Sequence, residues 1–269
     1  MTDFRSKRRF DAPLSRLGTL GPFHVMVALA VAYAVLLTLY LVSDLALVLV
    51  VLVAVVAGGT DRLVRLHPQA RFHGPTATVL YLFLPGLFAL FSALATGQVD
   101  NTALRLLLGA VSVVLFGITV IAEYLTVDPD AETYEVARFG LLLSIYVTAL
   151  FAFIVALGGG FPLVAGVLLV GSVAFLLSVD MLRELEADAG ALWIQSGAIA
   201  VVMAECRWVL HFLSLPDLLA GVFMLVVFYV MTGLIQDSVT GRMNRASWTT
   251  YGGVFAVASL FILFARLLT

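Results

Sequence analysis

Long apolar stretches alternate with short polar segments along almost the whole chain. Each stretch has roughly the 17–25 residues that a helix needs to cross a bilayer, except the second, which is short unless it continues through Asp61 to Leu66. The pattern predicts an all-α, polytopic membrane bundle with nine transmembrane helices, at residues 23–42, 45–59, 76–96, 103–126, 138–158, 162–182, 191–213, 217–237 and 248–268. Eight spans would result instead if the first two stretches formed one re-entrant or strongly kinked unit.

The basic residues between the stretches predict the orientation. Twelve of them fall on the side of the N-terminus and two on the other side. Because Lys and Arg accumulate in cytoplasmic loops, we expect a cytoplasmic N-terminus, four hairpins that open outward and one final helix. Residues 1–22 then form a basic cytoplasmic segment and residues 23–269 a single transmembrane domain. No cleavable signal peptide is expected, because the first apolar stretch is long enough to remain as a span.

Composition narrows the class of protein and its partners. The chain is 62% hydrophobic and 12% charged, which excludes an ordinary soluble domain. We expect its partners to be the lipid bilayer, a small or lipid-like ligand and other membrane subunits, and we expect no nucleic acid. The expected location is a bacterial inner (plasma) membrane. Cys206 is the only cysteine, so no intrachain disulfide is possible, and the sequence indicates no particular cofactor.

Acidic residues recur at the predicted cytoplasmic ends of the even-numbered spans. Glu123, Asp180 and Asp237 are spaced 57 residues apart, and Gly109 and Gly166 keep the same interval near the other end. This spacing favours a repeated two-helix unit of about 57 residues, a known way to build transporters. Hairpins of similar length could also place their terminal acids at similar intervals without any repeat.

The stretch at 191–213 carries the charges that the other spans lack. Glu205, Arg207, His211 and Trp208 lie within it or at its end, and a charge inside a bilayer is costly unless it faces protein, water or a partner. We therefore expect this helix at the centre of the bundle, with these four residues lining a ligand or ion site. A structural ion pair, or outward-reaching side chains near the interface, is the alternative.

A second candidate site follows the sixth span. Asp180, Glu184 and Asp188 share one face if the segment is helical, and three carboxylates at a membrane edge could bind Mg²⁺ and through it a diphosphate. A helix that enters the cytosol also becomes charged for solubility alone, so a solvated face is the alternative.

Nine spans with acidic residues after the sixth resemble the layout of the UbiA-type membrane prenyltransferases. The resemblance implies an enzyme that acts on an isoprenoid diphosphate held by Mg²⁺ at two aspartate-rich loops. Asp180, Glu184 and Asp188 would belong to the second loop. The loop after the second span departs from the family pattern, because Asp61 is followed by Arg62 and Arg65 where the family is acidic.

Three functions therefore remain open. The first is a membrane protein that binds or transports a small or lipid-like ligand within the bundle. The second is an enzyme acting on a lipid or isoprenoid diphosphate at the cytoplasmic face. The third is an accessory subunit of a larger membrane complex, because almost no soluble mass is expected outside the bilayer.

Overall fold

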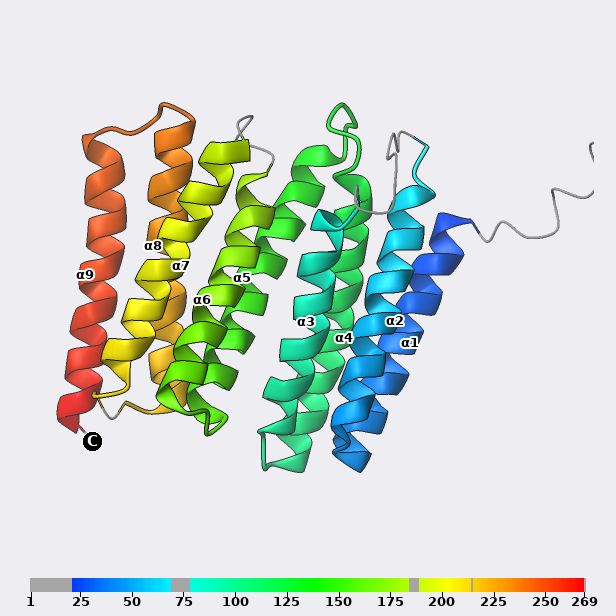
Figure 1. Cartoon of the computed structure of the whole chain (residues 1–269), viewed down its shortest axis with the longest axis horizontal. Helices are drawn as coiled ribbons and strands as arrows, with labels where there is room; N and C mark the ends of the chain where they lie inside the picture. Colours follow the sequence, from blue (N-terminus) through cyan, green and yellow to red (C-terminus); the bar gives the residue numbers. More distant parts are fainter. Residues whose placement is uncertain (1–20, 69–77, 184–188, 214, 269) are drawn as a thin grey trace, which may run out of the picture.

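The computed structural model describes residues 21–68, 78–183, 189–213 and 215–268, and side chains as far as residue 260. In these residues the chain is entirely helical, with short connections. The nine helices are α1 (Pro22–Ser43), α2 (Ala46–Arg65), α3 (Leu80–Gly97), α4 (Thr102–Leu125), α5 (Tyr134–Gly158), α6 (Leu163–Leu182), α7 (Ala189–Leu210), α8 (Asp217–Val239) and α9 (Arg245–Leu268). Figure 1 shows them side by side and roughly parallel.

The predicted helical membrane bundle is confirmed. Seven of the described helices, α1 to α6 and α8, are long and apolar enough to cross a membrane. The alternative of a re-entrant first pair is wrong, since α1 and α2 are separate helices and α2 continues to Arg65. Of the two other helices, α7 carries the polar residues Gln195, Ser196, Glu205 and Arg207.

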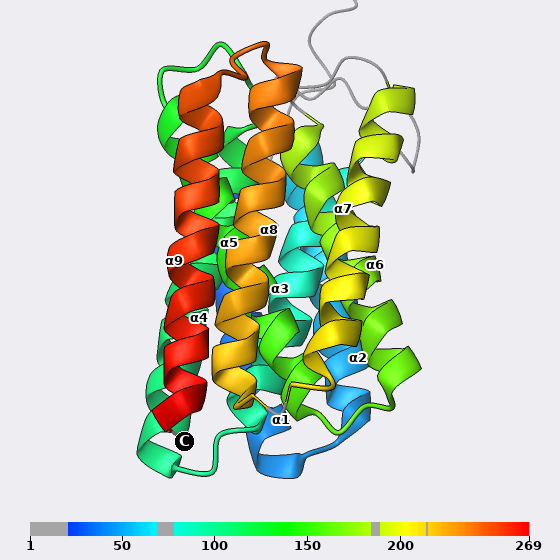
Figure 2. The ribbon, with the colours of Figure 1, turned by 90° about the vertical axis from the view of Figure 1, so that its left-hand side faces the viewer.

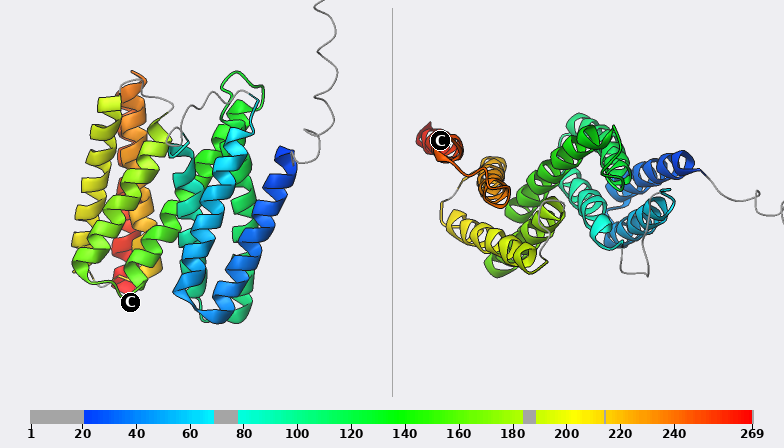
Figure 3. Two further views of the ribbon diagram at one scale, coloured as in Figure 1. Left: turned by 45° about the vertical axis from the view of Figure 1, so that its right-hand side comes forward. Right: turned by 90° about the horizontal axis from the view of Figure 1, so that it is seen from above.

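The helices form two units of four. In the first unit α1 packs on α2, α2 on α3, α3 on α4, and α4 back on α1; in the second, α5 to α8 close a ring in the same order. The units meet where α3 packs on α5 and α6 and where α4 packs on α5, and α9 packs on α8. Seen from above, the result is an elongated layout with α1 and α9 at opposite ends (Figure 3).

Each unit has its own apolar core. Tyr33, Phe88 and Phe116 are completely buried in the first unit, where the rings of Tyr33 and Phe116 stack 4.3 Å apart. The Tyr33 hydroxyl shares a 2.7 Å hydrogen bond with the Ser92 hydroxyl, which satisfies a buried polar group. In the second unit Phe153 and Phe228 pack edge to face, with ring centroids 6.0 Å apart. Large aromatic side chains therefore fill both cores.

The two ends of the bundle differ in charge and in loop length. At the end where the odd-numbered helices begin lie Arg62, Arg65, Arg138, Arg183, Arg242 and Arg245, and we call it the basic end. At the other end, the turn end, the connections between the paired helices are short. The basic end is the one that the sequence predicts to be cytoplasmic.

The expectation that α7 is central is wrong. Within the described part of the chain, α7 packs against α6 and α8, so one of its faces points away from the protein (Figure 2). The helices that lie between the two cores are α3 and α5 instead. The prediction rested on the charged residues of α7. These lie close to the turn end of the bundle, within reach of the membrane interface, so they do not require a central helix.

Candidate functional site

A buried charge cluster lies at the basic end, where the two units meet. Arg183 follows the last residue of α6, and its Nη2 donates to Glu123 Oε2 on α4 over 3.0 Å. Its Nη1 lies 2.7 Å from Asp180 Oδ1, one turn earlier in α6. The guanidinium carbon also lies 4.1 Å from the centre of the Tyr81 ring on α3. The cluster therefore joins α3 and α4 of the first unit to α6 of the second.

Solvent is almost completely excluded from these groups. The side chains of Glu123 and Asp180 are 0% exposed and that of Arg183 is 8% exposed. Burial alone would lower the pKa of Arg183, but the charges of Asp180 and Glu123 outweigh it and raise that pKa above its usual value. Arg183 therefore stays charged at any physiological pH. A buried ion pair of this kind fixes how the helices fit together.

Two of the three acids expected to repeat come together in this cluster. Glu123 and Asp180 share Arg183, whereas Asp237 is half-buried at the end of α8, where its carbonyl accepts a hydrogen bond from Arg242 N over 2.9 Å. The interval of 57 residues thus stays a prediction of a repeat. The shared packing order of the two four-helix units is a separate observation, because each of these units has four helices and the predicted repeat has two.

The predicted Mg²⁺ site lies partly outside the described residues. Glu184 and Asp188 belong to the segment 184–188, which is not described, and Asp180 is bound by Arg183. Near the end of α2, Asp61 accepts hydrogen bonds from Arg65 and Thr78, with Arg65 Nε 2.9 Å from Asp61 Oδ2. Asp180, the one described acid of the predicted Mg²⁺ set, and Asp61, in the region that departs from the family pattern, are thus both engaged by arginine. Within the described part of the chain, no group of three or more His, Cys, Asp or Glu could hold a metal.

Near the turn end, Arg207 of α7 points into the protein. It is 4% exposed and packs against Gly166 of α6, where an added Cβ would lie 3.1 Å from its Nη2. Its Nη2 donates to the Ala156 carbonyl over 3.4 Å, a long hydrogen bond. Asp217 at the start of α8 supplies the acidic charge that acts on it. Arg207 thus contacts both α5 and α6 from α7.

The other predicted site residues of α7 point outward. Glu205 and His211 are exposed, and Trp208 is 49% exposed. The His211 ring lies edge-on against that of Phe212, with centroids 5.4 Å apart. Because residues two positions apart on a helix face different directions, the structure separates Arg207 from Glu205 rather than bringing them together. Glu205 and Trp208 lie three positions apart and line the same cavity.

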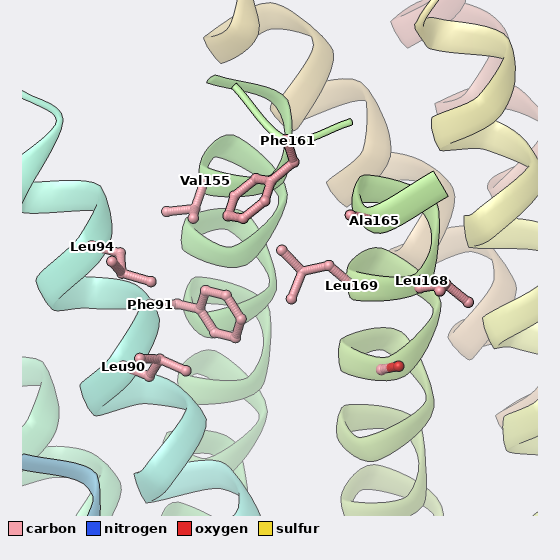
Figure 4. Close-up of a pocket in the computed structure, with 9 residues that line it drawn as sticks. Leu90, Phe91, Leu94, Val155, Phe161, Ala165, Leu168 and Leu169 are labelled. Carbon is pink, nitrogen blue, oxygen red and sulfur yellow. The ribbon is translucent and has the colours of Figure 1, made fainter. Parts of the chain in front are cut away.

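Apolar grooves flank α6 on both sides. The α3–α6 groove, of about 380 Å³, is drawn in Figure 4 and is lined by Leu90, Phe91, Leu94, Val155, Phe161, Ala165, Leu168, Leu169 and Ser172. The α6–α7 groove consists of two adjoining cavities of about 510 Å³ each, which share Val167, Val201 and Ala204. Leu168 and Ser172 line both grooves, so they adjoin across α6. The α6–α7 groove ends at Glu205 and Trp208.

Neither the α3–α6 groove nor the role of Tyr81 could be predicted from the sequence. Leucine and phenylalanine occur in every span, so no spacing distinguishes the ones that line a groove from those in a core. Tyr81 becomes notable only because α3 brings its ring over Arg183. Arg183 did stand out in the sequence, since it lies among four acids of its own segment, Asp180, Glu184, Glu186 and Asp188.

Comparison with known proteins identifies the family of the chain. No curated protein and no solved structure matches it significantly. A protein family does match, over residues 27–265, which include most of all nine helices. The chain therefore belongs to the family described as "Protein of unknown function (DUF5656)".

Proposed function

We propose that this multi-pass membrane protein binds a lipid-like molecule that enters from the bilayer on the outer face of α6. The observation that carries the proposal is the continuous apolar surface formed by the α3–α6 and α6–α7 grooves. Grooves of about 300–1,000 Å³ with mostly apolar walls and a few polar groups are typical of ligand sites. Here the polar groups are at one end, at Glu205 and Trp208.

The shape of the site favours a ligand with a long apolar part. The α3–α6 groove occupies the half of the bundle near the turn end, while contact between Tyr81 and Arg183 joins α3 to α6 at the basic end. The groove faces lipid, so a hydrocarbon chain that enters it leaves contact with other lipids and not with water. Selectivity therefore comes from packing and shape rather than from the exclusion of water. Glu205 and Trp208 would contact a polar head that carries a hydrogen-bond donor or a positive charge.

The test is to fill the α3–α6 groove and count the bound molecules. Ala165 is exposed and lines the groove, whereas its neighbour Val164 is equally exposed but lines none of the cavities described here. Native mass spectrometry of gently extracted protein should detect a bound molecule in the wild type and in Val164→Trp. We expect the bound fraction to fall several-fold in Ala165→Trp.

Other outcomes assign the protein differently. Equal occupancy in Ala165→Trp and Val164→Trp contradicts the proposal. A stoichiometric second polypeptide in the same spectra supports an accessory subunit instead. Mg²⁺-dependent turnover of an isoprenoid diphosphate that is lost in Asp180→Asn supports the enzyme. Transport would require, in addition, movement of the bound molecule between leaflets that Glu205→Gln or Arg207→Gln abolishes.

A further inference from the structure

A third groove lies between α1 and α4, in the other unit of the molecule. It has a volume of about 340 Å³ and is lined by Ala34, Leu37, Thr38, Leu41, Val42, Thr102, Arg105, Leu106, Gly109, Ala110 and Val113. Both helices reach the turn end here, since α1 ends at Ser43 and α4 begins at Thr102. The α1–α4 groove therefore runs from that end of the bundle into its apolar middle.

Arg105 is placed at the mouth of this groove. Its Nε donates to the Val99 carbonyl over 2.8 Å, which fixes the base of the guanidinium. In the described residues Arg105 takes part in no ion pair. It lies three residues into α4, about 4.5 Å along the helix at 1.5 Å per residue, which is the depth of the lipid head groups. A cation without an acidic partner thus faces the interface.

Small residues make room for a chain beside Arg105. Ala34, Gly109 and Ala110 line the groove, and a Cβ added to Gly109 would only reach the side chains of Leu37 and Leu41, at 4.0 Å. Toward the middle of the bundle the walls continue with Leu37 and Val113. Thr102 adds a hydroxyl at the mouth, whereas the Thr38 hydroxyl lies deeper and donates to the Ala34 carbonyl. The groove thus has one cationic, hydrogen-bonding end and one apolar end.

We propose that the α1–α4 groove binds a membrane phospholipid, with its phosphate on Arg105 and one acyl chain along the groove. Arginine is suited to phosphate because its planar guanidinium offers several donors at once, and charge-assisted hydrogen bonds are the strong ones. The recognised group is the phosphate diester that all glycerophospholipids share. This site is separate from the grooves at α6: the α3–α6 groove lies between the two units and the α6–α7 groove in the second unit, and the two lining sets share no residue with the α1–α4 groove (Figure 1).

The test counts phospholipids that stay bound after delipidation. Protein from nanodiscs of phosphatidylglycerol and phosphatidylethanolamine is washed with detergent. Native mass spectrometry then measures the fraction of protein that still carries a phospholipid. We expect Arg105→Gln to lower the fraction that keeps a phospholipid about tenfold, the loss expected when a charge-assisted contact to phosphate is removed. Ala110→Trp, which fills the groove, should lose it as well. Val111→Trp, on the next exposed position outside the groove, should keep it.

Three results would overturn the proposal. One is retention in Arg105→Gln that equals the wild type, which means that Arg105 is merely solvated at the interface. Another is equal loss in Ala110→Trp and Val111→Trp, which means that any added ring disturbs the helix. The third is loss in Arg105→Gln with none in Ala110→Trp, which places the phosphate outside the groove. Because Ala165→Trp leaves this groove untouched, failure of one lipid site is distinguishable from failure of the other.

Discussion

At the scale of single residues, the charged side chains of this bundle occupy two kinds of environment. Arg183 is enclosed by Glu123, Asp180 and Tyr81, and Arg207 is enclosed by backbone and a glycine of α6. Glu205 and Arg105 lie instead at the mouths of grooves. Enclosed charges hold helices together, whereas charges at a groove mouth are available to a ligand.

Removing Arg183 should strongly destabilise the protein. Arg183→Gln leaves Glu123 and Asp180 buried without their shared cation, and breaking a buried ion pair from one side costs about 3–5 kcal/mol. The free energy of unfolding in mixed micelles measures this. Arg242→Gln at the same end of the bundle is the control, because Arg242 is exposed, and exposed substitutions stay within about 0.5 kcal/mol. An Arg183→Gln protein as stable as this control would show that the cluster is not a structural clamp.

The charged residues also show what the sequence could predict and what it could not. The spacing of Glu205 and Arg207 is enough to put them on different faces of one helix, although the sequence was interpreted as placing both in one site. Which face is buried depends on the neighbours of α7, and these are set by packing between helices far apart in the sequence. For the same reason, the contact between Glu123 and Arg183 could not be predicted from the sequence, although both residues are plainly visible in it.

At the scale of helices, the sequence predicted the elements better than their partners. Eight of the nine predicted spans overlap their helices closely, and the second is longer, because Asp61 and Arg65 pair one turn apart and extend α2 beyond its apolar part. Apolar length is a local property, so it can be read directly from the chain. The grouping of helices into two rings of four is not local, and no spacing in the sequence indicated it.

Close packing of α9 on α8 should depend on one glycine. A Cβ added to Gly233 would overlap the ring and hydroxyl of Tyr251 on α9, so Gly233→Ala must push that side chain away. Overpacking of this kind costs about 1–3 kcal/mol. Gly252→Ala is the matched control, since nothing lies within 4 Å of its added Cβ and alanine is the better helix former. We expect thermal unfolding of the purified protein to begin earlier in Gly233→Ala only; equal behaviour of the two variants would contradict this contact.

At the scale of the whole molecule, the two units meet in a polar contact at one end and beside an apolar groove at the other. The charge cluster fixes α3, α4 and α6 at the basic end, and the α3–α6 groove lies toward the turn end. Relative movement of two such units around a fixed contact is how many transporters work. The proposed lipid site thus lies where two such units meet, and whether they move relative to each other can be examined once a ligand is known.

The orientation in the membrane is open to a direct test. In a Cys206→Ser background, which removes the single native thiol, Asp100→Cys and Arg242→Cys place one exposed thiol at the turn end and one at the basic end. We expect a membrane-impermeant maleimide to label Asp100→Cys in intact cells and Arg242→Cys only after permeabilisation, as the arginine distribution requires. The reverse pattern would mean that the bundle is inserted the other way round.

The charge cluster at the basic end also has a consequence for synthesis of the chain. Glu123 enters the membrane with α4, but Arg183, its partner, lies 60 residues further along. At about 5–20 residues per second, the ribosome needs about 3–12 s to supply that cation. During this interval the carboxyl group of Glu123 lacks the arginine that it binds in the folded protein. The contact between α4 and α6 therefore closes only after α5 and α6 have been synthesised, whereas packing within the first four helices can begin earlier.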